Sequence, residues 1–364
     1  MQLLIRRENI FDPLLSDDGQ WLVFQQRHNH PNGSISMVEV WATRTDGTEL
    51  HRLIGSDDLN FLVNDETAHF IHQIAWVPGR HELLFNTEKV IEGPPERWPV
   101  FDLFLLDLSG KVIRLAKAGQ GGKFFPSPDG SYVAVASSSR IRILDLKNGG
   151  QRASLKFDPV GLGCECVYIP EIAWDPGSQF ILTAIAPQNL YYPETYNDEL
   201  ERVWRLSSNG RVDLVSQFQP LALGEGIKTA PTAQYFFYLS TSCPDAMGML
   251  HVYNLASGEA TPLFCVWNLP HWVPDGEHFI YNWDLVWRFG SIFESTGADR
   301  PLDLLNAFPD TNSQLTWMDT EYFLLRSRNK DTCTLSIASL EGIIKEIVRT
   351  TSDVCPGFDF NLSD

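Results

Sequence analysis

Cysteine is scarce in this chain, with six residues in 364. So few cysteines exclude a fold held together mainly by disulfide bonds. Two pairs, Cys243 with Cys265 and Cys333 with Cys355, nevertheless show the same sequence separation of 22 residues. Two interpretations stay open for them: two disulfides inside repeated units, or four buried or partly buried thiols.

Long apolar runs are also missing. No stretch of about 18 apolar residues occurs, so we expect no segment that spans a membrane. The apolar part of Met1–Arg7 is too short for the core of an export signal, and no small-residue cleavage site follows it. The protein is therefore either cytoplasmic or exported by a signal removed before Met1, and the sequence decides neither this nor the oligomeric state.

Basic side chains are in deficit. The chain has 28 Lys and Arg against 46 Asp and Glu, a formal net charge of −18. Phosphate backbones and anionic lipid surfaces need clustered positive charge, and the overall field of this acidic protein repels them. The composition therefore disfavours nucleic acid as a partner.

Several catalytic and cofactor motifs are absent. The chain contains no Gly-x-Ser-x-Gly nucleophile elbow and no Gly-x-x-x-x-Gly-Lys phosphate loop. No sequence motif singles out a catalytic residue, a metal ligand or a cofactor, and we expect no bound cofactor.

Aromatic residues are plentiful, by contrast, with 11 Trp, 10 Tyr and 22 Phe. They are interspersed with 26 Gly and 22 Pro. Aromatic residues favour strands, and Gly and Pro favour tight turns. The composition therefore predicts many short strands joined by turns.

The clearest repeated unit runs from Phe124 to Ala136, where an apolar strand, a Ser-Pro-Asp-Gly turn and a second apolar strand follow one another. Asp suits this turn because its side chain bonds the backbone, and Gly because it tolerates a positive φ. In the fifth and seventh copies Asp-Gly is replaced. The seven copies cover residues 15–24, 75–85, 124–136, 173–182, 229–237, 272–281 and 317–324.

A second series of turns alternates with the first. Each of its members ends in glycine: Gly47, Gly110, Gly149, Gly210, Gly258, Gly297 and Gly342. Two hairpins in each repeat of about 40 to 60 residues give four antiparallel strands per repeat, which is typical of a propeller blade. We therefore predict an all-β, seven-bladed β-propeller.

We predict one domain over residues 1–364. Its blades are expected at approximately 8–55, 69–118, 121–158, 168–218, 225–266, 267–306 and 312–351. The segment Met1–Arg7 precedes the first complete repeat, and we expect it to pair with the last blade near Cys333–Thr350 and so join the two ends of the chain.

The repeated strand–Ser-Pro-Asp-Gly–strand phrase, followed by Leu-Asp-Leu and a glycine, resembles the TolB-like, WD-repeat-like propeller repeat over nearly the whole chain. The resemblance implies that the first strand of each blade lines a central channel. It also implies that the Ser-Pro-Asp-Gly turns lie on one face. The loops that enter each blade, and those that join its second and third strands, then lie on the other, where ligands most often bind.

Aromatic residues in the long loops of that second face form the first candidate site. Rigid rings with a polar edge are common in protein, peptide and sugar recognition. The alternative is that the rings only pack these loops onto the blades. The candidates are Trp98, Tyr191, Tyr192, Tyr196, Phe61 and Tyr168.

Polar residues just before the channel-lining strands form the second candidate set. They are His72, Glu171 and His271, together with Glu225 and Gln314. Imidazole and carboxylate groups at a channel mouth can bind a metal or transfer protons. The alternative is that they bind ordered water.

The predicted function is that of a non-enzymatic binding scaffold for a protein or peptide on the loop-rich face. The alternative is a hydrolase or lyase that acts on a polysaccharide or peptide at the channel mouth and that could depend on a metal.

Overall fold

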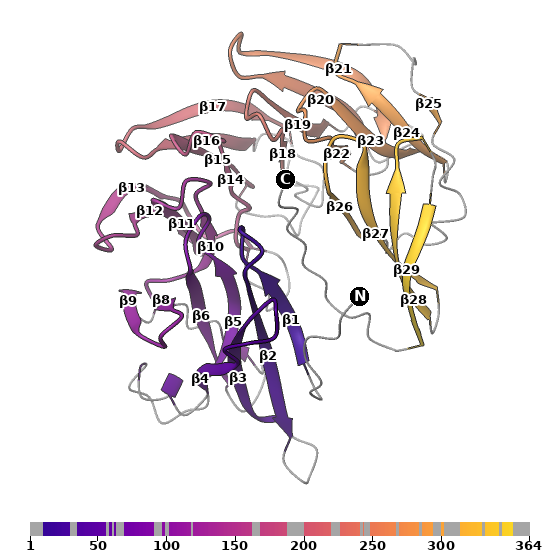
Figure 1. Ribbon diagram of the computed structural model, residues 1–364. Coiled ribbons are helices and arrows are strands. Elements are labelled where there is room, and N and C mark those ends of the chain that lie inside the picture. Colours follow the sequence, from indigo (N-terminus) through magenta and orange to yellow (C-terminus); the bar gives the residue numbers. More distant parts are fainter. Residues whose placement is uncertain are drawn as a thin grey trace. The chain divides into compact units, whose positions relative to one another are not determined.

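The computed structural model consists of short β-strands that form seven antiparallel sheets, which follow one another along the chain (Figure 1). In each sheet the four main strands pair in chain order. The residues described are 10–29, 35–55, 58–59, 62, 69–90, 97–98, 102–117, 119–161, 168–187, 200–219, 226–240, 243, 248–266, 269–283, 286–293, 300–301, 314–329, 332–341 and 344–351.

The chain divides into two compact units, the first of which contains three sheets. The first sheet has β1 (Ile10–Leu15), β2 (Trp21–Asn29), β3 (Ile35–Arg44) and β4 (His51–Gly55). The second has β5 (His69–Trp76), β6 (Glu82–Val90), β8 (Leu103–Asp107) and β9 (Val112–Ala116), and the two-residue β7 (Arg97–Trp98) also pairs with β6. The third has β10 (Lys123–Pro126), β11 (Tyr132–Ala136), β12 (Arg140–Asp145) and β13 (Gln151–Lys156).

The second unit contains four sheets. The fourth sheet has β14 (Ala173–Trp174), β15 (Phe180–Ile185), β16 (Glu201–Ser207) and β17 (Val212–Phe218), and the fifth has β18 (Lys228–Thr229), β19 (Tyr235–Ser240), β20 (Gly248–Asn254) and β21 (Glu259–Val266). The sixth has β22 (His271–Trp272), β23 (His278–Trp283), β24 (Val286–Ser291) and β25 (Arg300–Pro301), and the seventh has β26 (Gln314–Trp317), β27 (Tyr322–Asn329), β28 (Thr332–Ser339) and β29 (Ile344–Thr351).

Each sheet has two ends of different character. We call the turn end the one where the first strand turns into the second and the third into the fourth. We call the loop end the one where the chain enters the sheet and where the second strand connects to the third. The predicted Pro-Asp-Gly turns and the glycine turns at Gly47, Gly110, Gly149, Gly210 and Gly258 lie at the turn ends, because they follow first and third strands. Gly297 and Gly342 lie outside the described residues.

The turns keep one backbone geometry even where the sequence departs from the repeat. Gly19, Gly130 and Gly276 adopt φ values of +66°, +65° and +72° at equivalent places in the first, third and sixth sheets. In the fifth sheet Ala233 takes φ +51° there, and in the fourth Ser178 takes φ +57°. The left-handed conformation is therefore retained although these two residues have side chains that disfavour it.

The core lies between neighbouring sheets within each unit. One buried cluster joins Val23 of the first sheet to Phe85 of the second, and another joins Leu84 of the second to Phe124 of the third. In the second unit, Phe237 of the fifth sheet packs on Trp272 of the sixth with ring centroids 3.9 Å apart. The fourth strand is more exposed in the third and fourth sheets, where it is β13 and β17. Face-to-face burial of the inner strands therefore stabilises the stack.

Tryptophan residues at the ends of first strands link neighbouring sheets. The indole Nε1 of Trp76 in β5 donates to the carbonyl of Leu14 in β1, at 3.2 Å. The indole Nε1 of Trp272 in β22 makes the same kind of bond to the carbonyl of Lys228 in β18, at 2.8 Å. Both rings are buried, so the second and sixth sheets satisfy these indole N–H groups on the preceding sheet.

One of the two cysteine pairs is bonded. Cys243 and Cys265 form a disulfide, with their Cα atoms 6.0 Å apart. It ties the connection between β19 and β20 to the end of β21 in the fifth sheet. Cys355 lies outside the described residues, so the Cys333–Cys355 pairing stays a prediction.

The all-β class and the seven sheets of four main strands are confirmed. Within the described residues, no helix is long and apolar enough to cross a membrane. The pairing of Met1–Arg7 with the last sheet falls outside the described residues, and the single domain over 1–364 with its blade limits stays a prediction.

Candidate functional site

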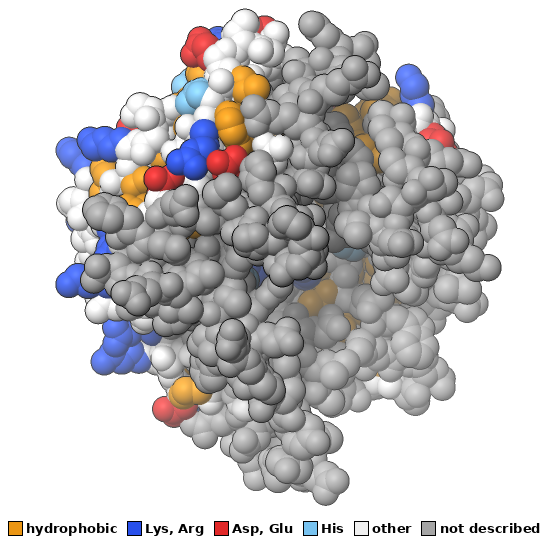
Figure 2. Space-filling model, turned by 90° about the horizontal axis from the view of Figure 1, so that it is seen from below, with side chains coloured by type: hydrophobic (Ala, Val, Ile, Leu, Met, Phe, Trp, Pro, Cys, Tyr) orange, Lys and Arg blue, Asp and Glu red, His pale blue; other side chains and the backbone are white. Residues whose placement is uncertain are grey.

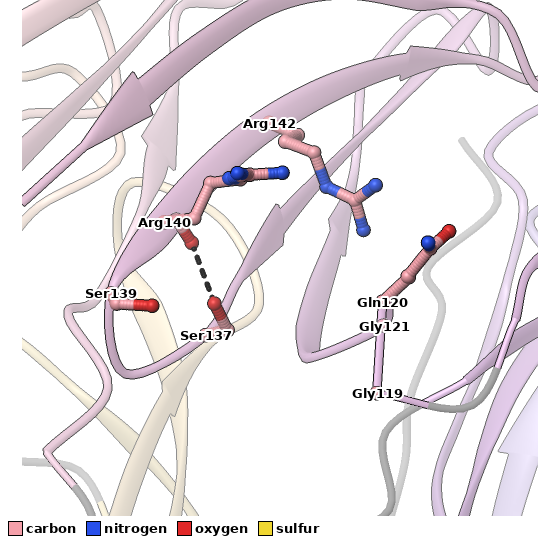
Figure 3. Close-up of a pocket in the computed structure, with 7 residues that line it drawn as sticks. All are labelled: Gly119, Gln120, Gly121, Ser137, Ser139, Arg140 and Arg142. Carbon is pink, nitrogen blue, oxygen red and sulfur yellow. Dashed lines mark hydrogen bonds between the residues drawn. The ribbon is translucent and has the colours of Figure 1, made fainter.

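A hollow of about 240 Å³ opens at the loop end of the third sheet (Figure 3). Two segments form it: the chain that enters the sheet just before β10, and the connection from β11 into β12. All of its lining residues are polar or glycine: Gly119, Gln120, Gly121, Ser137, Ser139, Arg140 and Arg142.

The two arginines lie on one side of β12 because side chains two residues apart in a strand point the same way. Between and beyond them, Ile141 and Ile143 are fully buried on the opposite side. Figure 3 shows both guanidinium groups on the side of β12 that faces Gln120 across the hollow. The Arg-Ile-Arg-Ile pattern therefore anchors the strand in the core and holds two positive charges over the opening.

The glycine segment opposite is fixed by two amide side chains of the second sheet, one buried and one half-buried. Asn86, which has no exposed surface, donates from Nδ2 to the carbonyl of Gly122 at 2.8 Å. Gln73 donates from Nε2 to the carbonyl of Phe124 at 2.8 Å and accepts from its N–H at 3.1 Å. A Cβ on Gly122 would come within 2.0 Å of the carbonyl oxygen of Ala136, so only glycine fits there.

The serine turn is equally well defined. The N–H of Ser137 donates to the carbonyl of Arg140 at 2.8 Å, and its hydroxyl donates to the same carbonyl at 3.1 Å. The N–H of Phe157, just after β13, donates to the carbonyl of Ser139 at 3.0 Å. The hollow is therefore bordered by hydrogen-bonded backbone on both sides.

The two guanidinium groups have no anionic partner in the part of the chain that the structure describes. Among the described residues, no carboxylate lies within 4.0 Å of the side chain of Arg140 or Arg142, and neither side chain makes a hydrogen bond. Burial, with the nearby positive charge of Arg140, lowers the pKa of Arg142 from its usual value. Both effects disfavour the charged form of Arg142, so an anion placed between the two groups would relieve an existing electrostatic cost.

The surroundings of the hollow are basic although the protein is acidic. Residues 110–157 contain nine Lys and Arg and only two Asp and Glu. One of these cations, Lys156, lies directly opposite Arg140 in the strand register. On the face drawn in Figure 2, Lys and Arg side chains gather along one margin of the described surface. The local field therefore favours anions, against that of the whole chain.

The turn end of the same sheet is different. Asp129 accepts hydrogen bonds from the Ser127 hydroxyl at 2.7 Å and from the N–H of Ser131 at 3.0 Å. The first sheet repeats this arrangement with Ser16, Asp18 and Gln20. Burial raises the pKa of Asp18, but these bonds and a contact with His81 outweigh it and lower the pKa to about 2. The turn aspartates are thus engaged within the fold.

The predicted aromatic site cannot be assembled from the described residues. Phe61, Tyr191, Tyr192 and Tyr196 lie outside them, and Trp98 falls in β7, paired with Lys89 of β6. Tyr168 is described, and its hydroxyl donates to the carbonyl of Ala184 and accepts from the N–H of Ala186, both at 3.2 Å. Burial raises the pKa of Tyr168. A role of these rings in binding stays a prediction.

The predicted channel-mouth residues are distributed over both units. His72 lies in β5 of the second sheet, Glu171 just before β14 and His271 at the start of β22. His271 has exposed surface, yet surrounding protein and the charge of Lys228 lower its pKa. In the described residues, no three His, Cys, Asp or Glu side chains are placed to hold a metal. Glu225 is outside them, and Gln314 begins β26.

A buried acid lies at the loop end of the fourth sheet. Glu201, the first residue of β16, is only 1% exposed, and its Oε1 atom has no hydrogen-bond partner in the described part of the chain. Burial raises its pKa to about 7. Its charge, with that of Glu171, also acts on the Tyr168 hydroxyl, so the structure brings two of the predicted site residues near an acid that the sequence analysis did not select.

The sequence analysis did not find the arginine hollow either, although signals for it exist. Gly119-Gln-Gly-Gly122 just before a predicted strand indicates close backbone approach. Arg140-Ile-Arg-Ile143 shows the period of a half-buried strand with cations on its outer side. What the sequence lacks is the register that places these two segments side by side.

Comparison with known proteins identifies a fold. No protein-family model and no curated protein sequence matches this chain. The β-propeller domain of the Trilobed protease from Pyrococcus furiosus is similar in structure, with a TM-score of 0.53 and 8% identity over 94% of this chain and 96% of that one. A eukaryotic initiation factor matches with a TM-score of 0.54 and 10% identity, over 94% and 79%.

TolB from Acinetobacter baumannii also matches, at 12% identity over 92% of this chain and 80% of that one, but its TM-score of 0.41 is too low to support a conclusion. At such low identities the similarity concerns the fold alone. Together with the seven four-stranded sheets, it shows that this chain is a seven-bladed β-propeller.

Proposed function

We propose that this chain is a binding scaffold that recognises a protein or peptide at the loop ends of its sheets. The observation that carries the proposal is the hollow between Gly119–Gly121 and Arg142. There two cations have no partner among the described residues, and hydrogen-bonded backbone borders the opening. Propellers place variable loops on a fixed set of sheets, and binding residues concentrate on loops held by a rigid framework. A membership of the TolB-like repeat family is part of this proposal.

The size of the hollow supports recognition of a larger partner. Pockets that enclose a drug-sized ligand measure about 300–1,000 Å³, and this one is smaller, at about 240 Å³. It has room for one polar group and not for a whole metabolite of that size. Such a group is most readily presented by a side chain or terminus of a peptide that also contacts neighbouring loops.

Peptide selection tests the function directly. We expect random peptides displayed on phage to be enriched on the immobilised chain, and photo-cross-linking of a selected peptide to label loop-end residues such as Gln120 or Ser139. Labelling of turn-end residues such as Ser131 or Asn148 would contradict the proposed face. Failure to enrich any peptide would contradict the scaffold itself.

A hydrolase or lyase is the second candidate function, and Glu201 is the observation that favours it. A buried carboxyl group with a pKa near 7 can transfer protons at neutral pH. Release of reducing ends from a panel of polysaccharides, or of new amino termini from casein, would support this function if Glu201→Gln abolished it. Glu259→Gln, at an exposed carboxylate of β21, should leave it unchanged. No release by the wild-type chain at any pH from 5 to 9 would count against it.

A further inference from the structure

We infer that the hollow at the loop end of the third sheet is an oxyanion site, which binds a carboxylate or phosphoryl group carried by an acidic peptide. The inference rests on the proposed function and names the chemistry of the group that the scaffold recognises. It does not depend on the aromatic residues of the long loops.

Hydrogen-bond donors dominate the side chains that line the hollow. Arg140 and Arg142 together offer ten N–H donors and no acceptor, while Gln120 and the Ser139 hydroxyl add further donors from the other segments. Planar guanidinium groups bind carboxylate and phosphate oxygens in pairs, and such charge-assisted bonds are about twice as strong as neutral ones. A ligand with several acceptor oxygens and a negative charge therefore fits this lining, and a neutral or cationic one does not.

Arg152 of the same sheet has a counter-ion among the described residues, whereas Arg140 and Arg142 have none there. Arg152, in the neighbouring strand β13, pairs with Asp145, and this contact raises the pKa of Arg152 and lowers that of Asp145. Arg205 and Arg211 in the fourth sheet share Asp213. In a chain with 46 acidic residues, carboxylates are abundant, yet the described ones leave Arg140 and Arg142 unpaired.

The charge of the whole protein limits the kind of anion. A net charge of −18 repels large polyanions at long range. An anion binds in spite of this repulsion only if it makes short-range contacts with the guanidinium groups. One or a few acidic groups on a peptide satisfy that condition, because most of the peptide contributes no charge.

Phosphorus NMR provides a test that needs no known partner. Inorganic phosphate is the probe, and its ³¹P line broadens when it exchanges with a protein of this size. At constant ionic strength we expect broadening with the wild-type chain and at least ten-fold weaker phosphate binding with Arg142→Gln or Arg140→Gln. Arg152→Gln is the matched control, because it removes the same charge from the same sheet at the Asp145 pair, and it should bind phosphate as the wild type does.

Peptide competition then distinguishes the sources of the oxyanion. A peptide with glutamate or phosphoserine at its centre should displace phosphate and narrow the line, whereas the same peptide with glutamine or serine should not. Equal competition by the neutral peptides, or an equal loss in Arg152→Gln, would overturn the inference. Thermal melts of all variants check that each is folded.

Other outcomes separate this inference from the proposed function. Phosphate binding at the arginines without competition from either acidic peptide would overturn the peptide ligand and indicate a site for small anions. Phage-selected peptides that lack acidic residues and bind Arg142→Gln normally would leave the scaffold function standing and remove the oxyanion site.

Discussion

At the turn end of the third sheet, Asp129 and Ser127 bond each other and the backbone, so that the polar groups of the turn are satisfied. At the loop end of the same sheet, Arg140 and Arg142 are held over a hollow without any partner among the described residues. Both ends belong to the same four strands. If the proposed function is correct, the aspartate turn and the ligand-binding groups lie at opposite ends of one sheet.

The fourth sheet, in the other unit, shows a related contrast. Asp175 at its turn end accepts from the N–H groups of Gly177 and Phe180, at 3.1 and 2.6 Å. Glu201 at its loop end has a carboxyl oxygen without a partner in the described part of the chain. Unpaired charged groups therefore occur at loop ends in both units, where they reduce stability and are available for other interactions.

The largest effect is expected from Gly130→Ala at the turn end. Gly130 has φ +65°, and a Cβ there would come within 2.3 Å of the carbonyl oxygen of Pro78. We expect a loss of roughly 3 kcal/mol in the free energy of unfolding, from the strained backbone and the overlap together, with oxyanion binding retained while the protein is folded.

Gly19→Ala is the control for this variant, because Gly19 has φ +66° but no atom within 4 Å of the position that a Cβ would take. Its cost should be about 1 kcal/mol, from the backbone alone. Urea unfolding measures both values. Equal losses in the two variants would show that the contact with Pro78 does not matter.

Glu201→Gln tests whether the loop end reduces stability. In the wild type, burial raises the pKa of the Glu201 carboxyl group from 4.5 to about 7 on folding. The folded state therefore binds this proton more tightly than the unfolded state. The resulting stability is fully present below pH 4.5 and is lost as the pH rises through 7. Removing the charge should abolish this loss and increase the free energy of unfolding at pH 8 by about 3 kcal/mol.

Unfolding by urea between pH 4 and pH 8 provides the measurement for Glu201. Glu171→Gln is the comparison, since Glu171 is exposed in the same sheet, and its variant should keep the pH dependence of the wild type. A wild-type stability that does not fall between pH 4.5 and pH 7 would contradict the role given to Glu201.

The smallest effect is expected at the imperfect turn of the fifth sheet. Ala233 has φ +51°, where glycine is preferred. We expect Ala233→Gly to raise the free energy of unfolding by roughly 0.5–1 kcal/mol, because relief of the strained backbone exceeds the added entropy of the unfolded chain. Thermal unfolding measures this gain. Ala230→Gly, in the same turn but without positive φ, should lower the free energy of unfolding. A similar loss of stability in both variants would show that the positive φ of Ala233 is not strained.

Much of the fold could be predicted because each turn is determined by a few residues that are adjacent in the sequence. Asp129 stabilises its hairpin through its side chain, and Gly130 does so by adopting a positive φ. Both residues belong to one short sequence motif, so the turn is recognisable from the sequence. The fifth copy is harder to recognise since Ala233 occupies the position of the glycine. The hollow could not be predicted in the same way, because Gly121 and Arg142 meet only through the register of β10, β11 and β12.

Two indole hydrogen bonds can report on contact between neighbouring sheets. They join Trp76 to the carbonyl of Leu14 and Trp272 to the carbonyl of Lys228. Each indole proton can exchange with deuterium only when its sheet parts from the preceding one. The exchange rates of these two protons therefore measure how often one repeat opens against its neighbour, as distinct from unfolding of the chain as a whole.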